Sequence, residues 1–307
     1  MRRFEYLEAR TLRQAIGMLQ RHGEQARIVA GSTDFLVRWR AGFWHPDYVV
    51  NIQRVPGLSR VTYNRRSGLR LGALVTIQTL EQHPAIRRHY PALAAAAASF
   101  AGVQVRNLAT VGGNICNASP SGDTLPALLA YGAECRLSGP DGHRQASLEQ
   151  LFTGPGQTVL SHDEVLTEIT LPPPAPGTGS LYIKHSPRGA MDIATVGVAS
   201  ALTVDRRSGV CAEARIALGA VAPTPLRAHA AEELLRGKQP DAELLQAAAE
   251  LAMSSATPID DVRGTAGYRR QMVGVLTRRT LEQSAAAATG KPLSYEDHRR
   301  FAIQAAA

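Results

Sequence analysis

The chain has 307 residues, a formal net charge of +8 and an apolar fraction of 44%. This length is enough for two or three compact units with a sizeable core. The basic residues are scattered and aromatic residues make up only 5% of the chain, which argues against a nucleic-acid interface. No apolar run approaches the ~20 residues of a membrane span. The basic first residues precede no apolar segment, so we expect no export signal.

Three cysteines, Cys116, Cys135 and Cys211, are widely spaced along the chain. They form none of the short Cys-x-x-Cys patterns that bind zinc or iron–sulfur clusters. Such sparse use of cysteine is typical of a reducing compartment, and we expect a cytoplasmic location. The nine histidines show no ligand-like pairing. We therefore expect no metal site on this chain.

The first recognisable elements surround a short loop of small residues. Thr11–Leu19 has the apolar spacing of a helix, with Thr11 suited to its N-cap and Gly23 to its end. An apolar strand, Arg27–Ala30, then leads into the loop Gly31–Asp34 and a second helix. A strand, a small-residue loop and a helix start can present free backbone amides to an anion. The loop is either a phosphate cradle or a simple helix cap; the GxGxxG dinucleotide fingerprint is absent.

A second glycine-bearing stretch runs from Thr110 to Asp123. Gly112 and Gly113 stand between Thr110 and Asn114, and glycine allows positive φ and close approach of a ligand. Consecutive amides in such a bend can form an anion nest. Thr110 and Asn114 would add side-chain hydrogen bonds, and Asp123 an acidic acceptor. A Gly-Gly pair is also typical of a structural turn, but the similar loop upstream favours a phosphate cradle.

The rest of the chain predicts a mixture of strands and helices. Short apolar or alternating runs predict strands at 48–52, 69–73, 75–76, 133–137, 145–148 and 163–171, and an alanine-rich run predicts a helix at 91–100. The proline cluster 172–177 cannot join a sheet and marks the main domain boundary. Beyond it, strands are expected at 181–185, 193–204 and 211–218, and helices at 230–235, 242–253 and 267–283. Strands followed by helices indicate an α+β unit, and the tail past residue 290 carries no strong signal.

Several motifs together resemble one known family. They are Ala30-Gly31-Ser32-Thr33-Asp34, then Gln104-Val105-Arg106-Asn107 running into Thr110-Val111-Gly112-Gly113-Asn114, and later Asp260-Asp261-Val262-Arg263-Gly264. Over most of residues 1–285 the chain resembles the FAD-binding medium subunit of molybdenum hydroxylases. Carbon monoxide dehydrogenase has such a subunit, and xanthine dehydrogenase has a flavin domain of the same kind.

The resemblance implies an α+β fold with two domains. A two-subdomain FAD-binding domain of the vanillyl-alcohol oxidase (PCMH) type would span residues 1–175, with subdomains at about 1–57 and 58–175. A small C-terminal α+β domain would span residues 179–285, and residues 286–307 would form a tail.

The resemblance also implies which residues bind FAD. The two loops would hold its diphosphate and ribityl chain, Asp123 would bind the cofactor, and Leu166 would contact the flavin through its backbone. Phe100 would pack on the cofactor or fill the core. Lys184 would be a solvated charge, or a cation that stabilises the anionic reduced flavin. The full set is Ala30, Gly31, Ser32, Thr33, Asp34, Phe35, Phe100, Thr110, Val111, Gly112, Gly113, Asn114, Asp123, Leu166 and Lys184.

The sequence departs from the family pattern at two points. The family usually has glycine where Ser32 stands, so the turn there is expected to adopt a conformation open to a non-glycine residue. Ser186-Pro187 interrupts an arginine-rich stretch after the lysine, which bears on the outer edge of the flavin and on its electron acceptor.

The function implied by the resemblance is electron transfer within a complex. A molybdopterin-binding large subunit would oxidise the substrate, and a small subunit would carry [2Fe-2S] clusters. FAD on this chain would pass electrons to an external acceptor, and the complex would be a dimer of heterotrimers. No residue here is expected to be catalytic. Two alternatives stay open: a standalone FAD-dependent NAD(P)H oxidoreductase, and an interaction subunit that has lost FAD.

Overall fold

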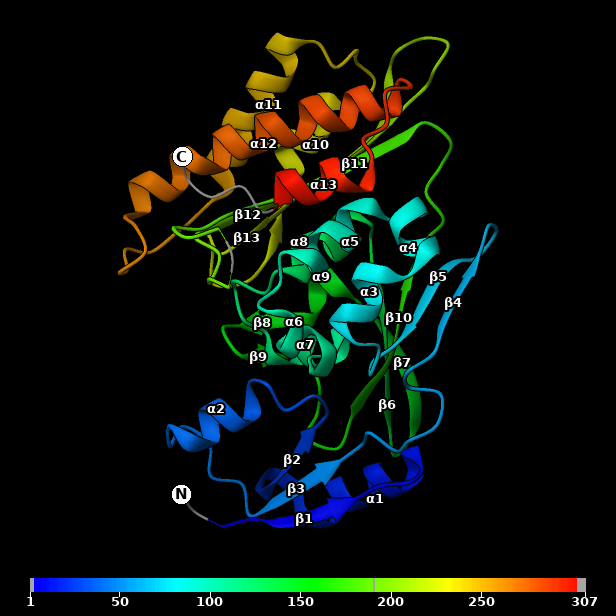
Figure 1. Ribbon diagram of the computed structural model, residues 1–307, viewed down its shortest axis with the longest axis vertical. Coiled ribbons are helices and arrows are strands. Elements are labelled where there is room, and N and C mark those ends of the chain that lie inside the picture. The colour runs from blue at the N-terminus through cyan, green and yellow to red at the C-terminus, as the bar shows by residue number, and fades with distance from the viewer. Residues whose placement is uncertain (1–2, 190, 303–307) are drawn as a thin grey trace.

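The computed structural model describes residues 3–189 and 191–302 and stacks them in three units (Figure 1). Each unit is built on its own main sheet, with strand orders β1-β3-β2, β4-β5-β10-β6-β7 and β11-β12-β13-β14. The first unit lies at the bottom of Figure 1, the second in the middle and the third at the top.

The first unit is a small parallel sheet with helices between its strands. Its elements are β1 (Glu5–Glu8), α1 (Leu12–His22), the 3-10 turn η1 (Gly23–Gln25), β2 (Ala26–Val29), α2 (Phe35–Arg40) and β3 (Tyr48–Asn51). β3 is central and pairs in parallel with both neighbours. The predicted helix is confirmed at both ends. Thr11 Oγ1 accepts a hydrogen bond from the Gln14 amide, and Gly23 ends the helix at φ 53°.

The second unit is a five-stranded antiparallel sheet with helices beside it (Figure 1). Its elements are β4 (Val61–Asn64), β5 (Gly68–Gly72), α3 (Ile77–Gln82), α4 (Pro84–His89), α5 (Pro91–Ala98), α6 (Val103–Leu108), α7 (Val111–Asn117), α8 (Thr124–Ala130), β6 (Glu134–Gly139), β7 (Gly142–Ser147), α9 (Leu148–Leu151), β8 (Phe152–Gly154), β9 (Gln157–Thr158) and β10 (Val165–Leu171). The alanine-rich helix α5 is buried nearly all round, as expected of a helix that is apolar on every side.

The third unit is an antiparallel sheet covered on both faces. Its elements are β11 (Thr178–His185), β12 (Val196–Val204), β13 (Cys211–Gly219), β14 (Leu226–Arg227), α10 (His229–Leu235), α11 (Ala242–Ser255) and α12 (Ala266–Ala288). α12 packs on β11 and β12, whereas α5 and α8 of the second unit pack on the same sheet. Side chains of β11, β12 and β13 therefore contribute to two separate cores.

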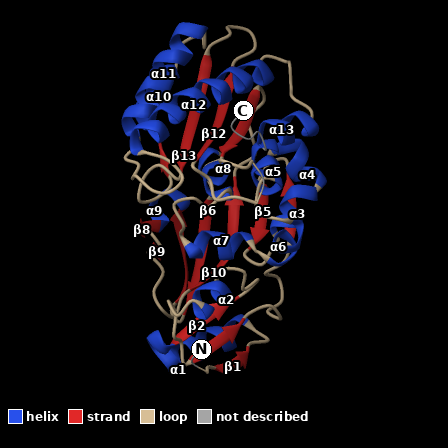
Figure 2. Ribbon diagram, turned by 60° about the vertical axis from the view of Figure 1, so that its left-hand side comes forward, coloured by secondary structure: helices blue, strands red, loops and turns tan. Residues whose placement is uncertain are grey.

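The predicted mixture of helices and strands is confirmed, with local differences. The expected strand at 75–76 forms only an isolated bridge between Thr76 and Thr110. β12 begins at Val196 rather than at residue 193. The tail contains a helix, α13 (Tyr295–Ala302), that returns to pack on α5 and β11. Figure 2 shows α13 beside α4 and α5. No helix in residues 3–189 and 191–302 is long and apolar enough to cross a bilayer.

Candidate functional site

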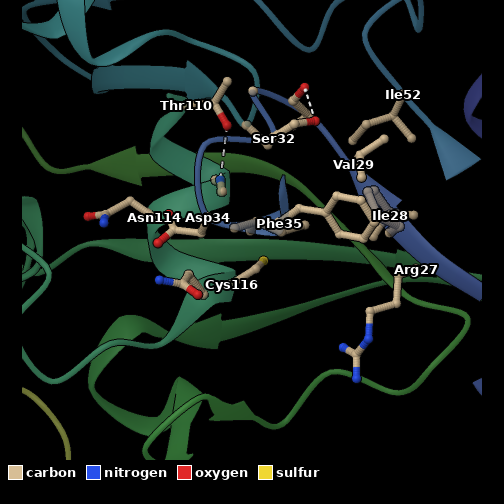
Figure 3. Close-up of a pocket in the computed structure, with 18 of the residues that line it drawn as sticks. Arg27, Ile28, Val29, Ser32, Asp34, Phe35, Ile52, Thr110, Asn114 and Cys116 are labelled. Atoms are coloured by element: carbon tan, nitrogen blue, oxygen red, sulfur yellow. Dashed lines mark hydrogen bonds between the residues drawn. The ribbon is translucent and has the colours of Figure 1, made fainter. Parts of the chain in front are cut away.

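A cavity of about 370 Å³ opens between the first and second units (Figure 3). The loop after β2 forms one wall, α7 forms the opposite wall, and β10 with the segment 158–162 closes a third side. The predicted site residues that line it are Ala30, Gly31, Ser32, Thr33, Asp34, Phe35, Phe100, Thr110, Gly112, Gly113, Asn114 and Leu166. The two glycine-bearing segments therefore meet across one space, as the sequence predicted.

Two glycines are required because backbone segments approach each other closely. A Cβ added at Gly31 would overlap the carbonyl oxygen of Leu108, and one added at Gly112 would lie 2.6 Å from the carbonyl oxygen of Ala73. Gly113 differs, because its added Cβ would meet only Thr110 Oγ1, at 2.9 Å, and otherwise open space. Gly113 is thus the position where a side chain would project into room that a ligand could use.

The stretch that begins at Thr110 differs from the predicted bend. Gly112 and Gly113 lie in the first turn of α7, and neither has positive φ. Thr110 is the N-cap residue, and its Oγ1 accepts a hydrogen bond from the Gly113 amide at 3.1 Å (Figure 3). A threonine at this position satisfies a donor that the helix itself leaves unpaired. The stretch from Thr110 to Asn114 is therefore the capped start of a helix and not a turn.

The amides on the two walls are not equivalent. The Val111 amide donates to the Val75 carbonyl and the Gly112 amide to the Ala73 carbonyl, both at 2.9 Å. The predicted anion nest at residues 110–114 is therefore wrong, because the segment before α3 occupies these donors. The amides of residues 31–35, by contrast, donate no hydrogen bond to any other residue in the described part of the chain. Backbone amides that are free to bind a ligand are therefore found at residues 31–35.

Ser32 adopts a left-handed conformation, whereas the sequence predicted a turn that suits a non-glycine residue. Its φ is 59°, in the region that favours glycine. The turn therefore keeps the backbone that a glycine would take, in spite of the side chain. The Ser32 hydroxyl lies 3.5 Å from the Ala30 carbonyl oxygen, which is at the limit of a hydrogen bond.

Charged side chains at the cavity come from the first unit. Asp34 is exposed toward the cavity, yet desolvation by the surrounding walls raises the pKa of its carboxyl group, with Arg38 and Asn117 opposing the shift. Arg27 and Arg38 each lie 4.8 Å from the ring centroid of Trp44, a cation–π distance. Arg27 and Trp44 line the cavity, but the sequence analysis did not select them, because nothing in their local pattern separates them from surface residues.

Asp123 and Lys184 form a buried ion pair behind the cavity wall. Lys184 is 1% exposed, and its Nζ lies 2.8 Å from Asp123 Oδ2 and 3.2 Å from the Ser99 carbonyl oxygen. Burial raises the pKa of Asp123 to about 6, while Lys184 acts to lower it. The solvated-charge interpretation of Lys184 is therefore wrong. Lys184 is also not a lone cation, because Asp123 compensates its charge.

Short contacts connect this ion pair to the cavity lining. Ser99 precedes Phe100, which is half-buried, lines the cavity and also packs on the core. On the other side, Thr124 Oγ1 donates to Asn114 Oδ1 at 2.6 Å. Asp123 Oδ1 has no hydrogen-bond partner among the described residues. Val111, Asp123 and Lys184 are the predicted residues that lie outside the lining, and Val111 belongs to the core.

The hydrogen-bond donors and the apolar side chains that line the cavity fit a dinucleotide-like cofactor. The free amides of residues 31–35 suit a diphosphate, and the open space at Gly113 leaves room for it. The apolar residues Ile28, Ile52 and Leu166 suit flat rings. No cluster of metal-ligating side chains occurs in residues 3–189 and 191–302.

Known families and proteins match the chain almost end to end. A family described as "FAD binding domain in molybdopterin dehydrogenase" matches residues 2–174, and one described as "CO dehydrogenase flavoprotein C-terminal domain" matches residues 182–284. The xanthine dehydrogenase FAD-binding subunit of Escherichia coli O157:H7 is 35% identical over 287 residues, which are 93% of this chain and 97% of that protein. The carbon monoxide dehydrogenase medium chain of Hydrogenophaga pseudoflava is 35% identical and covers 91% of this chain and 96% of its own.

Solved structures show the same fold. Carbon monoxide dehydrogenase from Hydrogenophaga pseudoflava aligns with a TM-score of 0.89 at 35% identity, covering 93% of this chain and 98% of that one. Quinoline 2-oxidoreductase from Pseudomonas putida 86 aligns with a TM-score of 0.86 at 28% identity, covering 94% and 98%. The predicted α+β fold, with an FAD-binding domain followed by a C-terminal domain, is confirmed. The chain belongs to the family of FAD-binding subunits of molybdenum hydroxylases, together with those of xanthine dehydrogenase and carbon monoxide dehydrogenase.

Proposed function

We propose that this chain relays electrons within a molybdenum hydroxylase, from [2Fe-2S] clusters on a partner subunit, by way of bound FAD, to an external acceptor. The observation that carries the proposal is the cavity between the first two units, with free amides on one wall and a glycine helix start on the other. Flavin supplies the redox chemistry when it is bound, and the chain supplies binding, orientation and electrostatics.

Individual residues have distinct parts in holding FAD. The amides of residues 31–35 would bind the diphosphate, because they donate no hydrogen bond within the described part of the chain. Gly113 would leave the space that the diphosphate enters. Phe100 and Leu166 would pack on the flavin. The Asp123–Lys184 pair would hold the wall behind Phe100 through the Ser99 carbonyl.

We also propose which subunits assemble with this chain and in which compartment the complex works. A molybdopterin-binding large subunit and a [2Fe-2S] small subunit would complete the enzyme as a dimer of heterotrimers. The relatives named as medium chains or FAD-binding subunits support this. The substrate would bind on the large subunit. The free thiols of Cys116, Cys135 and Cys211 are consistent with the cytoplasm as the working compartment.

The test compares substitutions at two neighbouring glycines. Gly113→Val would project a side chain into the cavity and should reduce FAD binding at least a hundredfold, with the melting temperature within a few degrees of wild type. Gly112→Ala would press on the Ala73 backbone and should destabilise the fold instead. FAD titration followed by flavin fluorescence measures the first effect, and thermal unfolding measures the second. Normal FAD affinity in Gly113→Val would refute the assigned cavity.

Native purification tests the partners. The complex should carry molybdenum and iron in stoichiometric subunits that copurify with this chain. If the chain instead purifies alone, binds FAD and oxidises NAD(P)H, then it is a standalone reductase and the proposed relay is wrong. If the wild-type chain binds no FAD at all, then it is an interaction subunit.

A further inference from the structure

Arg106 is a buried arginine that connects three helices near the cavity. It lies on α6, and its side chain is only 12% exposed. Its Nε lies 2.9 Å from Glu81 Oε2 on α3 and donates to Gln78 Oε1 at 3.3 Å. Its Nη1 donates to the carbonyl oxygens of Phe100 and Ala101, both at 3.1 Å. These contacts use the branched planar shape of guanidinium, which an ammonium group cannot reproduce.

The carbonyls that Arg106 binds follow the end of α5. This helix ends at Ala98, whose carbonyl oxygen also lies 3.4 Å from Arg106 Nη1. Helix ends leave carbonyl groups without intrahelical partners, and a positive charge there is favourable to the helix dipole. α5 has no basic residue of its own in its last turn. Arg106 therefore supplies the cap from a different helix.

The segment held by this cap has an unfavourable backbone conformation. Ala101 has φ 38°, in the left-handed region that non-glycine residues avoid. Such a conformation persists only where the surroundings fix it. The hydrogen bond from Arg106 to the Ala101 carbonyl is one such restraint, and the Glu81 carboxylate and the Gln78 side chain hold the other side of the guanidinium.

The same segment carries two groups of the proposed cofactor site. Phe100 lines the cavity, and the carbonyl of Ser99 accepts the hydrogen bond from Lys184 Nζ. We infer that Arg106 is a positioning residue for the flavin site: it fixes residues 99–101, and through them the Phe100 ring and the Lys184 ammonium group. The inference depends on the proposed function, because it concerns how the cavity holds FAD.

The experiment compares Arg106→Lys with a matched substitution, Arg227→Lys. Arg227 of the third unit is also largely buried, with 18% of its side chain exposed, and pairs with Glu232 of the same unit and with Glu149 on α9 of the second unit. Both variants should lose thermal stability. Arg106→Lys should raise the Kd for FAD at least tenfold and change the visible circular dichroism of the bound flavin. Arg227→Lys should leave both at wild-type values.

A double-mutant cycle tests whether Arg106 acts through Phe100. Phe100→Leu should weaken FAD binding on its own, and adding it to Arg106→Lys should cost much less than the product of the two fold-changes, because the ring is already displaced. If the fold-changes simply multiply, or if Arg106→Lys binds FAD like Arg227→Lys, then the inference is wrong. Wild-type protein that fails to bind FAD would instead refute the proposed function.

A milder substitution covers the case in which Arg106→Lys does not fold. Glu81→Gln removes the ion pair but keeps the arginine and its bonds to the carbonyls. It should raise the Kd for FAD severalfold and alter the same circular dichroism bands. An unchanged Kd and an unchanged spectrum in Glu81→Gln would contradict a positioning role for Arg106.

Discussion

Ser32 holds a left-handed backbone in the loop whose amides are free for a ligand. A non-glycine residue in this conformation costs stability, whereas glycine adopts it without penalty. The serine hydroxyl contributes little stability, since the one hydrogen bond it makes within residues 3–189 and 191–302 is at the distance limit. The position is therefore mildly strained, and the strain lies directly on the proposed diphosphate site.

Replacing Ser32 by glycine should relieve this strain. We expect Ser32→Gly to raise the free energy of unfolding by about 0.5 kcal/mol, which is the relief of the left-handed cost less the added entropy of the unfolded chain. Thr33→Gly is the control and should lower stability, because Thr33 is not in the left-handed region. Urea unfolding of the three proteins measures the difference. A loss of stability in Ser32→Gly would show that the side chain makes a net contribution.

Single residues were predictable where their chemistry is local. Thr11 and Gly23 were assigned correctly to the ends of α1, because a cap and its helix are adjacent in sequence. The state of the amides after Thr110 was not predictable. Their acceptors are the carbonyls of Val75 and Ala73, 36 and 39 positions upstream, and no local pattern shows that those carbonyls lie there.

α13 is one of the elements that the sequence did not indicate, together with β4, α3 and α4. It is short and rich in charged residues, so its pattern resembles a solvated tail. In the structure it packs on α5 and β11, and Arg87 lies 4.0 Å from the ring centroid of Tyr295. His298 is buried on its inner side, at 3% exposure. The helix thus packs against both the second and the third unit.

Acid should weaken this contact through His298. Burial lowers the pKa of His298 to about 4, whereas an unfolded histidine titrates near ~6.5. Between these values the unfolded state binds a proton that the folded state does not, so stability is lost as the pH falls from about 6.5 to 4. From pH 7.5 to 5, His298→Gln should remove up to about 2 kcal/mol of the acid-induced loss.

Urea unfolding at the two pH values measures this prediction. His143→Gln is the control, because His143 is exposed at the tip of the β6–β7 hairpin. If His298→Gln and wild type lose the same stability between pH 7.5 and 5, then His298 does not carry the acid sensitivity of α13.

Across the whole molecule, the second and third units are joined by shared packing, by the buried ion pair Asp123–Lys184 and by the partly exposed ion pair Glu149–Arg227. Tyr131 of the second unit lies 2.6 Å, oxygen to oxygen, from Ser180 of β11. Lys184 Nζ on the same strand donates to Asp123 Oδ2 of the second unit. We propose that residues 172–177 separate the two domains, since the chain passes from one sheet to another there. Cooperative unfolding of both units is the expected consequence of the joint core.

Removing one partner of the ion pair should be costly. Lys184→Met would leave the Asp123 carboxylate buried without its counter-charge, and we expect a loss of about 3–5 kcal/mol in the free energy of unfolding. The double variant Asp123→Leu with Lys184→Met should recover most of this, because apolar residues can replace a buried pair. Urea unfolding of the single and double variants gives the comparison. A double variant less stable than Lys184→Met would contradict this account.

The order of elements in the third unit was predictable, because strand and helix periods are local and strong in β11–β13, α11 and α12. The placement of α5 and α8 on its sheet was not, since it depends on contacts between distant segments. The family resemblance provided the overall architecture, which residue patterns alone left at the level of an α+β mixture.

The hydrogen bonds from the Val111 and Gly112 amides to the segment before α3 have one more consequence. They preorganise one wall of the cavity, whereas the amides of residues 31–35 make no such hydrogen bond in the described part of the chain. Any entropic cost of ordering the site on binding should therefore fall on this loop more than on the start of α7. Affinity for the cofactor should depend on how stiff that loop is as much as on what it contacts.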